Sequence, residues 1–242
     1  MDNSSPGHST PKSHLDEIST RWAAVNDPIK FVNRYAPAIL NYLVAIIGNR
    51  LDAEDVSQDF LTNVIARGFA NVDPDRGRFR KYLKTAVHNA ALMFFRRKHT
   101  EQKALAAYER QMREGSAAHD VDRQWETTWT QCVLDRAWTT LHQRERRAGD
   151  NSFYTVLRAS VDHPDEDSTA LAPRVSASLG RTIQPDNLRK QLSRARRAFA
   201  ELLIEEVAQT IQGRSPAAIK DELVQTGLMP YVRAFLPTDW NE

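Results

Sequence analysis

The 242-residue chain has one cysteine, Cys132, which excludes an intramolecular disulfide framework and a zinc site built from several cysteines. Its 9 glycines and 11 prolines are too few for a collagen-like or low-complexity chain. The longest apolar run, residues 36–47, is interrupted by Asn41 and is shorter than the ~20 residues of a membrane-spanning helix. The first residues lack the apolar stretch of a secretion signal. We therefore expect a cytoplasmic protein without a membrane anchor.

The composition is that of a folded protein: 26% of the residues are charged and 41% are hydrophobic. Proline and glycine are rare inside the periodic segments, strand-like alternation is absent, and apolar residues recur at helical spacing. The sequence therefore predicts an all-α fold.

Composition shifts along the chain predict two helical domains joined by a flexible linker. Asp52 is expected to cap one helix of the first domain. The second domain is expected to begin near Trp125, with Trp129, Val133, Trp138 and Leu141 in its core. The last segment is either a packed helical cap or a regulatory appendage over a DNA surface. The expected divisions are an N-terminal tail at 1–19, a first domain at 20–100, a linker at 101–122, a second domain at 123–212 and a helical extension at 213–242.

The formal net charge is only +2, but the chain contains two basic blocks. Residues 67–103 contain ten basic and three acidic residues, and residues 181–198 contain six basic and one acidic residue. Two separated basic patches are typical of two contacts with one long polyanion. A solvated charged surface remains the alternative for either block alone.

The second block lies in a helix-turn-helix pattern. A short helix with Leu171, Val175 and Leu179 on one face stops at Gly180, and a longer helix begins near Pro185, a favoured first-turn proline. Helical hairpins are common, and the basic charge on the second helix is what favours DNA binding.

Two segments carry ordered motifs: Asp52-Ala-Glu-Asp-Val-Ser-Gln-Asp-Phe60, and Phe79-Arg-Lys-Tyr-Leu83 with Asn89 and Arg96-Arg97. They resemble the extracytoplasmic-function (ECF) sigma factors of bacterial RNA polymerase: the first is similar to a helix of sigma domain two, and the second to its promoter-melting helix. Residues 20–22, 73–79 and 205–210 resemble a subgroup frequent in planctomycetes. The resemblance implies a non-catalytic, cofactor-free subunit that binds core polymerase and melts promoter DNA.

A second set of motifs resembles sigma domain four. Val175-Ser-Ala-Ser-Leu-Gly180 and Leu192-Ser-Arg-Ala-Arg196 are similar to its helix-turn-helix elements. The turn after Gly180 is two residues longer than in the family, and Ser176 stands where the family prefers alanine. The resemblance implies that the second helix reads the minus-thirty-five element.

The resemblance assigns three sets of site residues. Core polymerase, through the clamp helices of β′, is expected to bind Asp52, Glu54, Asp55, Gln58 and Asp59. Minus-ten DNA is expected to bind Arg80, Lys81, Lys84, His88, Asn89, Arg96, Arg97 and Lys98, with the loop at 98–101 capturing a flipped base. Minus-thirty-five DNA is expected to bind Asn187, Arg189, Lys190, Ser193, Arg194, Arg196 and Arg197.

Other functions and partners stay open. A stand-alone helix-turn-helix regulator would explain the second block but would have no use for the acidic helix or the melting helix. A metal-dependent nuclease using Asp52, Glu54, Asp55 and His88 is disfavoured, because neighbouring acids on a helix diverge and the seven histidines show no metal-binding spacing. Further expected partners are the β flap and either an anti-sigma factor or a kinase. We expect no metal site.

Overall fold

The computed structural model describes residues 27–67, 78–98, 116–148, 151–211, 214–237 and 240. Within these ranges every regular element is a helix, so the all-α prediction is confirmed. The expected tail at 1–19, the motif at 20–22, most of the motif at 73–79, the capture loop beyond residue 98 and most of the linker lie outside the described residues. No described helix is long and apolar enough to cross a bilayer.

Three helices form one end of the molecule: α1 (Pro28–Ile47), α2 (Arg50–Arg67) and α3 (Phe79–Arg97). The carboxylate of Asp27 caps α1 by accepting the Lys30 N–H, and Gly48 ends it with a φ of 76°, where glycine has no Cβ penalty. Phe79, Leu83, Val87, Ala91 and Phe95 repeat every four residues on α3 and are buried. The apolar spacing of α3 thus fixes the face that it turns toward the core.

Asn49, not Asp52, caps α2. The Asn49 Oδ1 accepts the Leu51 N–H at 2.9 Å and the Asp52 N–H at 3.2 Å. Because α2 begins at Arg50, Asp52 is already inside its first turn, where its carboxylate accepts from the Lys98 Nζ at 2.8 Å. The prediction that Asp52 caps this helix was therefore wrong, since the cap lies three residues earlier, at Asn49.

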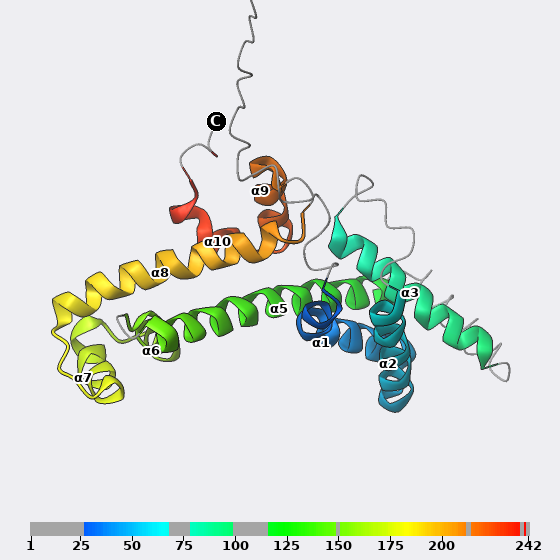
Figure 1. Ribbon diagram of the computed structural model, residues 1–242, viewed down its shortest axis with the longest axis horizontal. Coiled ribbons are helices and arrows are strands. Elements are labelled where there is room, and N and C mark those ends of the chain that lie inside the picture. Colours follow the sequence, from blue (N-terminus) through cyan, green and yellow to red (C-terminus); the bar gives the residue numbers. More distant parts are fainter. Residues whose placement is uncertain are drawn as a thin grey trace, which may run out of the picture.

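Helix α5 (Ser116–Ala148) runs through both expected domains. Its 33 residues make a rod about 50 Å long at 1.5 Å per residue. It packs against α1, and also against α6 (Phe153–Asp162) and α8 (Pro185–Ala208). Figure 1 shows α5 (green) extending from the α1–α3 end to the α6–α7 end, alongside α8. Residues 116–122, expected in a flexible linker, are helical.

Aromatic residues of α5 pack against α1. The Trp129 ring stacks on Tyr35 at 4.9 Å, and Trp125 meets Tyr42 edge-on at 5.1 Å. Burial raises the pKa of Tyr35 to about 12, so its hydroxyl stays protonated at neutral pH. Trp125 and Trp129 are both buried, and residues of α1 are their partners. The expectation that Trp125 begins a separate second domain with Trp129 in its core was therefore wrong.

The other half of α5 carries the second group of helices. Trp138 contacts Phe199 of α8 at a centroid distance of 4.6 Å, and Tyr154 of α6 at 5.8 Å. Beyond these lie α7 (Ser168–Leu179) and the N-terminal half of α8. The expected ends of this hairpin, Gly180 and Pro185, are confirmed.

The C-terminal segment packs on α8. It contains α9 (Pro216–Gln225), α10 (Met229–Val232) and a short 3-10 turn, Arg233–Phe235. Ile219, Leu223 and Leu228 are buried, and the segment covers the C-terminal half of α8 (Figure 1). The helical character expected of this extension is present, and its apolar face is packed.

We expect Trp129→Ala to lower the free energy of unfolding by about 3–5 kcal/mol, because it removes a buried ring and its stack on Tyr35. Urea unfolding followed by far-UV circular dichroism measures the loss. Val161→Ala, at an exposed position of α6, is the control and should stay within about 0.5 kcal/mol of the parent. A loss below about 1 kcal/mol for Trp129→Ala would contradict the α1–α5 packing.

Candidate nucleic-acid interface

The exposed face of α8 carries all seven residues predicted to bind minus-thirty-five DNA. Leu188, Leu192 and Ala195 turn the opposite face into the core, which fixes the rotation of the helix. Arg189 pairs with Asp186 at 3.1 Å. In the described part of the chain, the other cations of the set have no ion pair. The exposed set is Asn187, Arg189, Lys190, Ser193, Arg194, Arg196 and Arg197.

The long turn between α7 and α8 is held by Ser176. Its Oγ accepts the N–H of Ile183 at 2.9 Å and donates to the Ala172 carbonyl at 2.7 Å. Ile183 is buried, and Arg181 donates to the Ser152 Oγ at 3.0 Å. Gly180 turns the chain with a φ of 65°. Ser176 thus ties the end of α7 to the turn residue Ile183, two positions before α8 begins.

On α2 the predicted polymerase-binding residues divide into two groups. Asp55, Gln58 and Asp59 are exposed. Asp52 and Glu54 are half-buried and pair with Lys98 and Arg50, each at 2.8 Å. The first group forms the accessible acidic surface.

A groove of about 300 Å³ runs between α2 and α3. Asp55 and Asp59 line it from α2, and Asn89, Met93 and Arg97 line it from α3. It therefore joins residues that the sequence assigned to two separate partners. Met93, which is 51% exposed, was missed because a lone methionine in an apolar run carries no signal of exposure.

The predicted minus-ten residues on α3 do not share one environment. Lys81, Asn89, Arg96 and Arg97 are exposed, and Lys98 pairs with Asp52. Lys84 pairs with Asp122 of α5 at 2.5 Å. The pKa of His88 is lowered, chiefly by burial and also by the nearby charge of Lys84. The charge of Asp122 opposes this shift. The His88 imidazole is therefore mostly neutral at pH 7.

Arg80 departs from its expected role as an exposed DNA contact. Only 3% of its side chain is exposed. Its Nε donates to the Glu222 Oε1 at 2.7 Å, and its Nη1 pairs with Glu126. In this arrangement its charge is neutralised by carboxylates and is not open to a nucleic acid.

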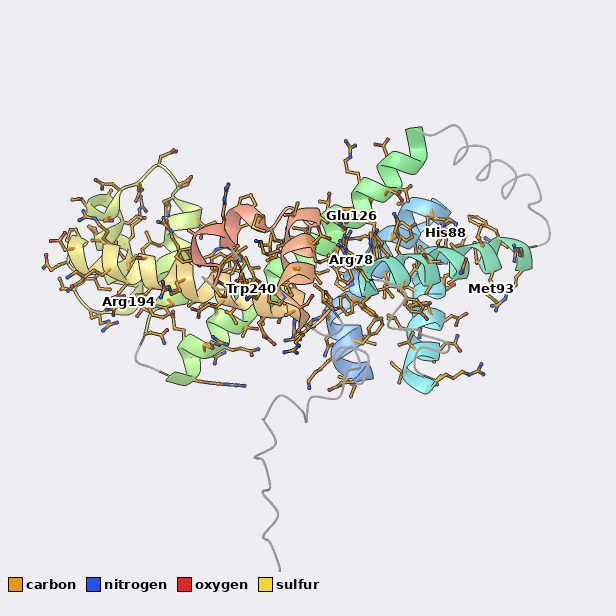
Figure 2. The ribbon with its side chains drawn as sticks, turned by 90° about the horizontal axis from the view of Figure 1, so that it is seen from above. Arg78, His88, Met93, Glu126, Arg194 and Trp240 are labelled. Carbon is orange, nitrogen blue, oxygen red and sulfur yellow. The ribbon has the colours of Figure 1, made fainter. Side chains whose placement is uncertain are left out.

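Arg78, at the start of α3, joins the same cluster. Its guanidinium pairs with Glu222 at 3.0 Å and with Asp221. Figure 2 shows Arg78 and Glu126 in the middle of the molecule, with Met93 and Arg194 toward opposite ends. Sequence reasoning missed these carboxylates because Glu222 lies 142 residues from Arg80.

The geometry does not assemble the residues of the nuclease hypothesis. Within the described ranges, no three histidine, cysteine, aspartate or glutamate side chains form a group that could hold a metal ion. Asp52 and Glu54 are instead engaged by Lys98 and Arg50.

We expect Ser176→Ala to lower the free energy of unfolding by about 1–3 kcal/mol, because the Ile183 N–H loses its acceptor in a half-buried turn. Ser178→Ala is the matched control, since its exposed hydroxyl bonds only the Arg174 carbonyl of its own helix. Urea unfolding and hydrogen exchange at the Ile183 amide measure the effect. Equal stability of the two variants would refute this role of Ser176.

Comparison with known families bears on the first three helices. Residues 31–101 match the family model Sigma-70 region 2, which covers most of α1, all of α2 and α3, and less than a third of the chain. No curated protein and no solved structure matches the chain. The match supports a sigma-70 family member with a role in transcription initiation, and implies RNA polymerase and promoter DNA as partners.

Proposed function

We propose that this chain is an ECF-type sigma factor of the planctomycete-type subgroup. It is a non-catalytic subunit that binds core RNA polymerase and directs promoter recognition, melting and initiation in the cytoplasm. The observation that carries the proposal is the Sigma-70 region 2 match on α1–α3, in a chain that also has a separate basic helix exposed at its other end. A stand-alone regulator would need only the second of these features.

The exposed acids of α2 suit a basic docking partner. Asp55 and Asp59 face the groove, and Gln58 is exposed on the same helix. In the family the corresponding surface docks on the clamp helices of β′. Charge complementarity of this kind fixes orientation and suppresses wrong partners. We assign this surface to core polymerase, and contact with the β flap to the helices around α8.

The exposed end of α3 suits the separated nontemplate strand. Arg96 and Arg97 offer charge to the backbone, while Asn89 and the neutral His88 offer hydrogen bonds to bases. Binding of single strands combines a basic track with base contacts of about 1–3 kcal/mol per stacked base. Lys81 extends the track, and Lys98 contributes when it leaves Asp52.

The exposed face of α8 suits a duplex major groove. Its first turns present Asn187, Arg189, Lys190 and Ser193, which have the chemistry to read base edges. Arg194, Arg196 and Arg197 follow and suit phosphates. An anti-sigma factor or a kinase is the regulator that we propose, and no cofactor is required.

We expect the full chain to support run-off transcription by purified core polymerase from a promoter selected with the holoenzyme. Asp55→Lys with Asp59→Lys should weaken core binding by about tenfold or more, because like charges would face the basic partner, and about 1.4 kcal/mol suffices for each tenfold. Affinity capture of labelled core and transcript yield measure both effects.

Thr62→Lys is the control for the charge reversals, since it adds a cation at another exposed position of α2. If the chain binds promoter duplex alone and core polymerase adds neither affinity nor transcription, the stand-alone regulator is correct.

We expect the salt dependence of DNA binding to distinguish the base-reading residues of α8 from its phosphate-binding residues. Arg197→Ala should weaken all duplexes alike and reduce the log–log salt slope by about 0.9, because one phosphate contact is lost. Asn187→Ala should reduce discrimination between promoter variants and leave the slope unchanged. Holoenzyme binding titrations at several salt concentrations measure both, and identical slopes for Arg197→Ala and the parent would contradict the assignment.

A further inference from the structure

Three cations on the first half of α3 meet carboxylates from distant parts of the chain. Arg78 pairs with Asp221 and Glu222 of α9, Arg80 pairs with Glu222 and with Glu126 of α5, and Lys84 pairs with Asp122 of α5. Four carboxylates thus cover these three cations, whereas Lys81 in the same half of the helix is exposed.

The second half of α3 is different. Arg96 and Arg97 are exposed and have no ion pair in the ranges that the structure describes. The acidic cover is therefore specific to the start of the helix, where α9 and α5 approach it. Helix α9 belongs to the segment outside the region 2 match and is the element that brings Asp221 and Glu222 there.

Buried ion pairs fix geometry more than they stabilise, because desolvation offsets most of their attraction. The Arg80–Glu222 pair has only 3% and 2% of its side chains exposed, so each charge depends on the other. A phosphate offers an arginine the same negatively charged oxygens as a carboxylate. DNA and α9 can therefore exchange as partners of these arginines.

We propose that α9 is an intramolecular competitor of promoter DNA for the first half of α3. In the free chain, Asp221 and Glu222, aided by Glu126 and Asp122 of α5, occupy Arg78, Arg80 and Lys84. Release of α9 removes Asp221 and Glu222 from Arg78 and leaves Arg80 with Glu126 alone, so the two arginines become available to the phosphates of the nontemplate strand. The inference rests on the proposed sigma function and adds a regulatory contact within the chain.

The test compares the full-length parent with Asp221→Asn combined with Glu222→Gln, which keeps side-chain shape and removes both charges. The probe is a fluorescent single strand of the minus-ten region, titrated at fixed salt. In the open form of the chain, α9 has left α3. If this form is about 10% populated in the parent, a variant that stabilises it raises the affinity for the single strand about tenfold.

The control variant combines Glu201→Gln with Asp135→Asn, which changes net charge equally. Both side chains are exposed and have no ion pair in the described residues. Any gain common to both variants is the general effect of charge on DNA binding, and the excess over the control measures the competition.

Energy transfer between dyes reports the movement itself. Met93→Cys on α3 and Val224→Cys on α9 place labels at positions 51% and 59% exposed. Cys132 stays unlabelled because it is buried, and burial raises the pKa of its thiol. We expect transfer to fall in the α9 variant and, for the parent, on addition of the single strand.

The inference is correct if affinity rises about tenfold over the control and transfer falls. It is wrong if the gain equals that of the control or if transfer is unchanged. Should circular dichroism show that the double variant is unfolded, Asp221→Asn alone decides in the same way, since the Asp221 side chain is 61% exposed. Transcription by the variant with core polymerase, without a gain in affinity, would refute the competition and leave the sigma function standing.

Discussion

The packing of α5 against both helical groups is the constraint on which the rest of the structure depends. One half stacks Trp129 on Tyr35 of α1, and the other half packs Trp138 on Phe199 of α8. Because a helix transmits its orientation along its length, the region 2 helices and the basic helix α8 are held in one arrangement. The buried pair of Arg34 and Glu206 joins α1 to α8 and adds directional specificity to that arrangement.

Local signals in the sequence predicted the helical hairpin of α7 and α8, but they misplaced the cap of α2 and the start of α5, and they did not identify the partners of the helices. The end of α7 at Gly180 and the start of α8 at Pro185 follow from residues within a few positions of each other. The course of α5 does not: its tryptophans fit a helix in either domain, and only the aromatic residues of α1 decide between them. Hydrophobic periodicity gives the buried face of a helix and leaves open which element covers it.

For the same reason, the sequence predicted only part of the candidate site. The exposure of the α8 cations was predictable because apolar residues occupy the opposite face of the same helix. Arg80 looked equivalent, since it lies beside Phe79 in a basic segment, yet its environment is set by Glu222 and Glu126. Long-range ion pairs have no periodicity, so the burial of Arg80 and the groove lined by Met93 required the fold.

Charge compensation therefore differs between the two basic blocks, although their composition is similar. On α8 the cations face solvent, and one local aspartate is their one ion-pair partner among the described residues. At the start of α3, carboxylates from α5 and α9 replace the water and counterions that would otherwise surround Arg78, Arg80 and Lys84. A polyanion that binds the exposed cations of α8 gains free energy from the release of counterions. At the start of α3 it must first displace carboxylates that are part of the fold. Two blocks of equal sign can thus bind DNA at unequal free-energy cost, because the acids that decide the difference lie elsewhere in the chain.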